Sequence, residues 1–347
     1  MEKQVRAKSA GSSSLGGKIL DFITLRRWII PLVLIVLYFI VYSILFTKSF
    51  LSAYNLTSMA LEFAIPTSFV IIGMAIMLIN GEIDLSVGYA CMFGNMLAGY
   101  MVINRLPLIL CIVVPIIASG LIGLVVGLLV SRVGINSFIA TLGSGMVFYG
   151  LGLVIYEMCR KFEAGAAIQH LEDWFIVISQ GKLVTFPDTG AIQYPVLYSL
   201  VLILIFTVLM SKSGFFRKYY YIGMNKETAA LSGINVKRMK TVAFTISSAL
   251  AGASGMLMCA RMGSSAVTLG TGLEMKAITA CVIGGVSFKG GIGSIGGAIL
   301  GGLFMVCLSN GLRIAYAPST VYKLIEGSVL LLAVIMDALI SKRKVVG

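Results

Sequence analysis

Residues 64–88 read AIPTSFVIIGMAIMLINGEIDLSVG. A continuous apolar run leads into two carboxylates, Glu82 and Asp84, and a second apolar run follows. A helix needs about 20 mainly apolar residues to cross a bilayer, and a charge at the bilayer centre costs about 3 kcal/mol. The stretch therefore predicts two membrane helices separated by a polar break, whose carboxylates must reach water, accept backbone N–H bonds or line a cavity.

The same apolar character extends over most of the chain. Hydrophobic residues make up 58% of its 347 residues, charged residues only 12%, and the mean hydropathy is +0.99. A soluble domain carries about 25% charged residues. Runs long enough to cross a bilayer begin near Trp28, Ala64, Ser86, Pro107, Ser137, Tyr194, Thr241, Glu274, Ser294 and Thr320. We therefore expect an all-α, polytopic membrane protein with about ten transmembrane helices, some of them broken or re-entrant.

Charge divides the chain and orients it. A polar N-terminal tail (1–27) without the features of a cleavable signal peptide precedes a single transmembrane domain (28–340), and a basic C-terminus (341–347) follows. With the N-terminus inside, 18 of the 27 Lys and Arg residues fall on inner segments, seven of them in the loop 211–240. Because cytoplasmic loops carry excess positive charge, we expect both termini in the cytoplasm. The net charge of +13 then reflects membrane topology and not nucleic-acid binding.

Several kinds of site are not expected. The six cysteines form no CxxC pair, and His170 is the single histidine, which disfavours zinc and haem sites. Lys289 is followed by Gly290 instead of Ser or Thr, so the chain has no Walker A loop. We expect no metal, no cofactor and no enzymatic activity on this chain itself.

Glycine spacing predicts close helix packing. Gly123 and Gly127 form a GxxxG pair, and Gly293, Gly297 and Gly301 form a longer ladder expected on one helix face. Lipid provides no hydrophobic reason for helices to associate, so close backbone approach must supply the packing energy.

The basic loop contains a predicted short helix. Asn225 suits the N-cap, Glu227 the first turn and Gly233 the C-terminal stop. So short a helix is unstable alone in water, so another surface must dock against it. Its centre, Ala229 and Ala230, lacks the large apolar side chains of a membrane-surface anchor.

Two interpretations remain open for the carboxylates. Asp84 followed by Ser86 suits a capped helix start, and direct contact with a substrate fits equally well. Glu274 opens a later span, where helix capping is favoured over substrate contact.

Four stretches together resemble the permease subunits of bacterial ABC importers for ribose, xylose, arabinose, galactose and the autoinducer sugar. They are residues 81–88, 136–143, 223–234 and 281–287 with 290–293, the last extending to Gly297, Asn310 and Gly311. The resemblance covers about residues 30–340. The Ile-Asp-Leu-Ser-Val-Gly string is specific within this group, whereas residues 143–145, Gly-Ser-Gly, replace the bulkier residues frequent in relatives.

The resemblance implies partners and roles. The permease would pair with a like or unlike permease subunit in the bacterial inner membrane, an external binding protein would deliver a monosaccharide, and ATP and magnesium would bind separate ATP-binding-cassette subunits. The coupling helix for the ATPase would comprise Asn225, Glu227, Ala229, Ala230, Ser232 and Gly233. Candidate residues of the translocation path are Glu82, Asp84, Ser86, Phe138, Thr141, Glu274 and Asn310.

One alternative belongs to a different class of transporter. An ion-coupled secondary transporter would use Glu82 and Asp84 as titrating groups and would also contain broken helices. It leaves the Asn225 helix without a role.

Overall fold

The computed structural model describes residues 28–160, 167–168, 171–186 and 190–346, so the predicted tail (1–27) and His170 lie outside it. The described part is predominantly helical, with two short two-stranded sheets. β1 (Ala167–Ile168) pairs antiparallel with β4 (Ser265–Ala266), and β2 (Lys182–Thr185) pairs antiparallel with β3 (Ala191–Gln193). The predicted all-α class is confirmed.

The helices of the described residues are, in chain order, α3 (Ile29–Leu45), α4 (Thr47–Phe50), α5 (Ala53–Glu62), η1 (Phe63–Thr67), α6 (Ser68–Ile79), α7 (Val87–Ile103), α8 (Leu108–Leu128), η2 (Leu129–Val133), α9 (Ser137–Arg160), α10 (Asp173–Gln180), α11 (Tyr194–Lys212), α12 (Gly214–Met224), α13 (Lys226–Leu231), α14 (Val236–Met262), α15 (Leu273–Ile283), α16 (Ile295–Ile314) and α17 (Ser319–Val346). Within these ranges, six continuous stretches are long and apolar enough to cross a membrane: Ala53–Ile79, Leu108–Val133, Ser137–Cys159, Tyr194–Lys212, Val236–Met262 and Ile295–Ile314. The 11 residues of α15 span only about 16 Å, so this helix is too short to cross.

Two helices begin earlier than predicted. The span expected from Ala64 begins at Ala53, because α5 continues through η1 into α6. Pro66 lies inside the π-helical η1, which accommodates a residue that has no N–H to donate. The span expected from Thr241 begins at Val236, because the Asn235 side chain accepts a hydrogen bond from the Arg238 N–H (2.9 Å) and caps the helix.

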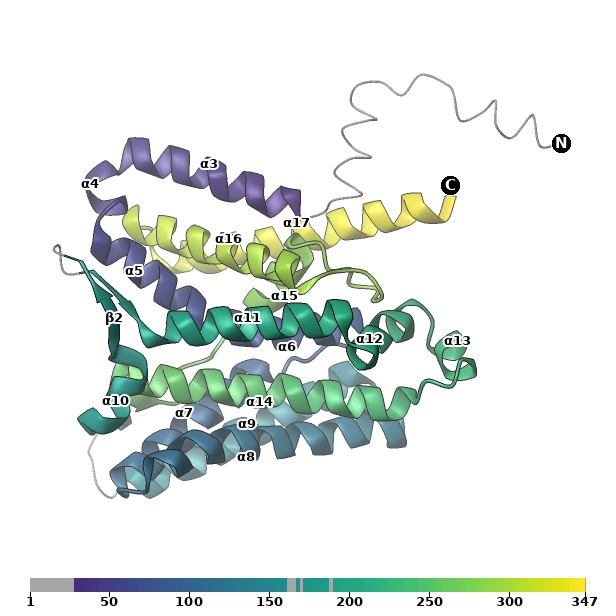
Figure 1. Ribbon diagram of the computed structural model, residues 1–347, viewed down its shortest axis with the longest axis horizontal. Helices are drawn as coiled ribbons and strands as arrows, with labels where there is room; N and C mark the ends of the chain where they lie inside the picture. The colour runs from purple at the N-terminus through teal and green to yellow at the C-terminus, as the bar shows by residue number, and fades with distance from the viewer. Residues whose placement is uncertain (1–27, 161–166, 169–170, 187–189, 347) are drawn as a thin grey trace.

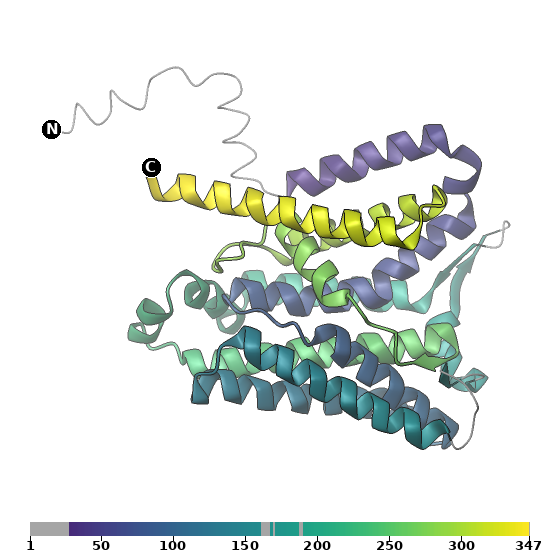
Figure 2. The ribbon, with the colours of Figure 1, turned by 180° about the vertical axis from the view of Figure 1, so that it is seen from behind.

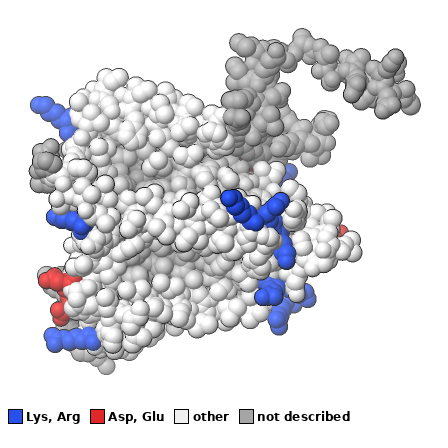
Figure 3. Space-filling view, viewed as in Figure 1, with Lys and Arg blue, Asp and Glu red and all other residues white. Residues whose placement is uncertain are grey.

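The two ends of the bundle differ (Figure 1). α12 and α13 project from one end, called here the α13 end, whereas β2, α4 and α10 gather at the opposite, β2 end. α3 begins and α17 finishes toward the α13 end in both ribbon views (Figure 2). In Figure 3 the charged side chains of one face lie at the two ends and leave an uncharged belt between them. This distribution is typical of a membrane-embedded protein.

Helices α6 and α14 form the centre of the fold. Every residue of α6 is buried, and α14 packs along α8, where Gly123 and Gly127 leave no room for a Cβ atom against Ser248 and Thr241. Small residues thus permit the closest helix contacts, as expected for packing in lipid.

The second glycine ladder is shorter than predicted. Gly297 and Gly301 of α16 lie directly against Gly284 and Ala280. The prediction that Gly293 lies on the same helix is wrong, because its φ of +146° places it in the preceding turn and the Ser294 side chain caps α16 by accepting from the Gly297 N–H.

Candidate functional site

The polar break between α6 and α7 spans residues 80–86 and is anchored by Asp84. The Asp84 carboxylate is fully buried. Its Oδ1 accepts hydrogen bonds from the Ser86 N–H (3.0 Å) and the Ser86 hydroxyl (2.6 Å). Its Oδ2 accepts from the Ser247 hydroxyl of α14 (2.7 Å). Asp84 therefore fixes Ser86, the residue that precedes the first turn of α7, and joins it to the central helix.

Glu82 lies closer to the α13 end and meets two lysines. Its Oε1 is 2.9 Å from the Nζ of Lys226, the first residue of α13, and 2.6 Å from the Nζ of Lys240 in α14. Only 5% of Glu82 is exposed. The two ammonium groups compensate for the burial of this charge.

Backbone atoms of three segments meet beside Glu82. The Gly291 N–H donates a hydrogen bond to the Ile79 carbonyl at the end of α6 (2.8 Å). A Cβ atom on Gly223, near the end of α12, would collide with both the Ile79 carbonyl oxygen and the Gly291 nitrogen. We call this contact between Ile79, Gly223 and Gly291 the glycine junction.

The turn between α15 and α16 is also fixed from its other side. Asp337 of α17 accepts hydrogen bonds at Oδ2 from the Phe288 N–H (3.0 Å) and the Ser287 hydroxyl (3.2 Å). The turn therefore connects the glycine junction to α17.

Helices α7 and α15 start against one another inside the bundle. A Cβ atom on Gly88 would collide with Glu274 Oε2 and lie 2.7 Å from the Gly270 carbonyl oxygen. The extended segment before α15 runs from the β2 end, whereas the break before α7 runs from the α13 end (Figure 2). α9 and α17 flank this meeting point in the same view. Two half-helices thus converge from opposite sides, an arrangement that many transporters use at their substrate path.

Comparison with known proteins identifies the family. The family described as "Branched-chain amino acid transport system / permease component" matches residues 56–334. The chain belongs to this family. The L-arabinose ABC transporter permease protein AraH of Azospirillum brasilense is 31% identical over 83% of this chain and 81% of the relative. The Xylose transport system permease protein XylH of Escherichia coli K12 is 29% identical (85% and 87%), and the D-allose transport system permease protein AlsC of the same strain is 31% identical (84% and 86%). No solved structure matches the chain.

The predicted coupling helix of this permease has the expected local structure. Asn225 Oδ1 accepts from the Glu227 and Thr228 N–H groups, both at 2.9 Å, and Gly233 adopts a φ of +80° beyond the last turn. Of the predicted coupling residues, Ala229 is buried, and the others are partly or fully exposed at the α13 end.

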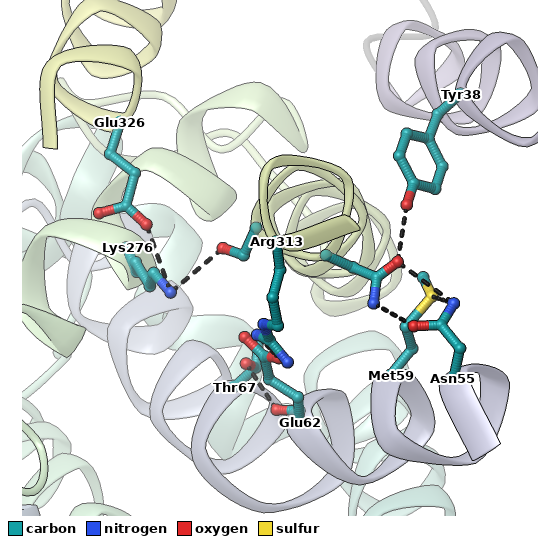
Figure 4. Close-up of polar contacts among 10 residues, drawn as sticks. Tyr38, Asn55, Met59, Glu62, Thr67, Lys276, Arg313 and Glu326 are labelled. Carbon is teal, nitrogen blue, oxygen red and sulfur yellow. Dashed lines mark hydrogen bonds and ion pairs between the residues drawn. The ribbon is translucent and has the colours of Figure 1, made fainter. Parts of the chain in front are cut away.

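The predicted path residues do not form one cluster. Phe138 is half exposed on the first turn of α9, whereas Thr141 is buried and donates to the Ser137 carbonyl of its own helix (2.8 Å). Asn310 lies nearer the β2 end, where it donates to Asn55 Oδ1 (2.7 Å) and accepts from the Tyr38 hydroxyl (2.9 Å; Figure 4). These contacts join α16 to α5 and α3.

Sequence reasoning missed two polar links in the same half of the molecule (Figure 4). Arg313 pairs with Glu62 (2.7 Å), and the Lys276 Nζ lies 3.3 Å from both Glu326 Oε1 and the Ser309 hydroxyl. The sequence does place these charged residues inside or beside apolar runs. Charged side chains in membrane helices usually face the bundle interior or pair with one another. The sequence carried this signal, but not which charges would meet.

Proposed function

We propose that this chain is the transmembrane permease subunit of a bacterial ABC importer for a monosaccharide. The family membership and the printed functions of the arabinose, xylose and allose relatives support this assignment. The chain carries few charges within its apolar helices, which suits a neutral and hydroxyl-rich solute. The chain supplies the pathway, and ATP hydrolysis with its magnesium ion belongs to a separate ATP-binding-cassette subunit.

The observation that carries the proposal is the surface of α13. This helix has six residues, too few to be stable alone, yet it is capped at both ends and projects from the bundle (Figure 1). Leu231 is 90% exposed and Met224, just before the cap, is 67% exposed. A short capped helix with bare apolar side chains fits a helix-in-groove contact, and the proposed groove belongs to the ATPase subunit.

The same assignment orients the protein in the inner membrane. The α13 end faces the cytoplasm together with both termini, in agreement with the excess of Lys and Arg on these segments. α15 and the break before α7 enter the membrane without crossing it alone. Six of the expected spans are long and apolar enough to cross within the described residues, and the total of about ten stays a prediction.

The proposed substrate path lies between α9 and α17, next to the starts of α7 and α15 (Figure 2). A second permease subunit, like or unlike, closes this face, and an external sugar-binding protein delivers the sugar at the β2 end. Glu274 and Phe138 are the candidate path residues on this face. The permease relatives favour this assignment over the ion-coupled alternative, and Glu82 and Asp84 are both engaged by side chains of the same chain.

Co-purification with the ATPase subunit tests the proposal. The chain is expressed with its genomic ATPase partner, and Leu231→Asp is compared with Tyr316→Asp at the opposite end of the bundle. Both parent side chains are about equally exposed, at 90% and 93%. We expect Leu231→Asp to lose the ATPase and Tyr316→Asp to retain it. Retention by both variants would remove α13 from the proposed contact, and failure of the unaltered chain to bind the ATPase would end the proposal.

A further inference from the structure

Glu82 connects α13 to the membrane interior. Its partners Lys226 and Lys240 lie far from it in sequence and on different helices. A buried carboxylate is strongly unfavourable unless it is paired, so this contact holds α13, α14 and the break together. Two residues beyond Glu82, Asp84 binds Ser86, the residue directly before α7. A displacement of Glu82 is therefore transmitted to α7 through a very short piece of chain.

The two lysines are not equivalent. The Lys240 side chain is 15% exposed and belongs to the central helix α14, whereas the Lys226 side chain is 49% exposed and belongs to the projecting α13. When α13 moves away, Lys226 can enter water while Lys240 still neutralises Glu82. The contact thus has two states, doubly and singly paired, and neither leaves a bare buried charge. A two-state element of this kind is what coupling between distant sites requires.

The glycine junction gives α13 a second connection. Gly223 precedes α13 by three residues and touches both Ile79 and Gly291. Gly291 belongs to the turn that follows α15. Asp337 of α17 binds this turn at Ser287 and Phe288. α13 and the residues just before it therefore contact the break before α7 and the turn after α15. The first turns of α7 and α15 in turn lie against one another at Gly88 and Glu274.

We propose that Glu82 is a positioning residue for energy coupling and does not line the substrate path. Movement of α13 reaches α7 through the pair of Glu82 with Lys226, and reaches α15 through the glycine junction. The two half-helices then shift against one another at Gly88. This inference rests on the proposed function, because it assumes that an ATPase subunit moves α13.

The test separates coupling from docking. The complete complex is reconstituted in proteoliposomes, and sugar transported per ATP hydrolysed is measured together with the amount of bound ATPase. Glu82→Gln removes the negative charge at a buried position, and Lys226→Met removes the positive charge at a half-exposed position. Lys226→Arg retains the charge, and Lys237→Met removes an exposed lysine in the first turn of α14.

We expect complexes with Glu82→Gln or Lys226→Met to retain the ATPase subunit and its ATP hydrolysis, while the amount of sugar transported per ATP falls about tenfold, a change typical of coupled sites. Lys226→Arg and Lys237→Met should keep the ratio of the unaltered protein. A normal ratio in Glu82→Gln, or in a Lys226→Met complex that retains the ATPase, would overturn the inference. Loss of ATPase binding in Lys226→Met would also overturn it, since Lys226 would then act in docking. Each of these results leaves the proposed function standing, which fails only if the unaltered complex does not assemble.

Discussion

Replacement of Asp84 distinguishes a structural carboxylate from a titrating one. Asp84 receives three hydrogen bonds, two from Ser86 and one from Ser247. Asp84→Asn preserves the shape of the side chain and the Oδ1 acceptor, and its amide group can donate to the Ser247 hydroxyl. Asp84→Ala removes both acceptor oxygens, and with them all three hydrogen bonds, and leaves two buried hydroxyl groups without this partner.

The structure sets the expected magnitudes. A net hydrogen bond contributes about 1 kcal/mol, so Asp84→Ala should destabilise the protein by about 3 kcal/mol or more, whereas Asp84→Asn should cost about 1 kcal/mol or less. The larger loss would free the start of α7 from α14. We therefore expect Asp84→Asn to transport sugar at close to the normal rate and Asp84→Ala to unfold at a clearly lower temperature and to lose transport.

Thermal unfolding in detergent measures the change in stability, and sugar uptake in proteoliposomes measures the change in transport. Asp173→Asn, an exposed Asp on α10, is the matched control and should change neither quantity. The reasoning is refuted if Asp84→Asn unfolds like the unaltered protein but abolishes uptake, because transport would then require a carboxylate that gains and loses a proton.

Three further predictions concern single contacts. Asn225→Ala removes both cap bonds of α13, which should destabilise this helix by about 1 kcal/mol and lower the amount of ATPase bound at limiting concentration; unchanged binding would contradict a role for the cap. Gly123→Val should lower thermal stability by about 1–3 kcal/mol because its side chain collides with α14, whereas Gly143→Val, with nothing within 4 Å of its Cβ position, should not; equal melting curves would be inconsistent with the packing described. Asn310→Leu leaves the Tyr38 hydroxyl without its partner and should cost about 1–3 kcal/mol, measured by unfolding; a stabilised variant would show that this contact is not required.

Local features were predictable from sequence. The break at Glu82 and Asp84 follows from charge inside an apolar run, and the α13 helix follows from the spacing of Asn225 and Gly233. These signals depend on a few neighbouring residues and on the energetic cost of leaving polar groups unpaired in lipid.

Long-range features were not predictable in the same way. Nothing near Glu82 in the sequence indicates Lys226 or Lys240, because the partner is decided by how distant helices pack. The extension of the span from Ala64 back to Ala53 was missed because proline usually marks the start or end of a helix, whereas the π-helical turn keeps Pro66 inside a continuous helix. The roles assigned from the family resemblance remain predictions for mutagenesis.

The glycine junction also limits how this permease can be altered by mutation. Gly223 touches the carbonyl oxygen of Ile79 and the nitrogen of Gly291, atoms that every amino acid carries at those places. A larger residue at position 223 therefore cannot be accommodated by trimming a neighbouring side chain. A genetic screen for suppressors of Gly223→Ala should recover true revertants and no compensating change at Ile79 or Gly291. Because this contact consists of backbone atoms, no side chain can change rotamer to absorb a movement. A small displacement of one segment is therefore passed directly to the others.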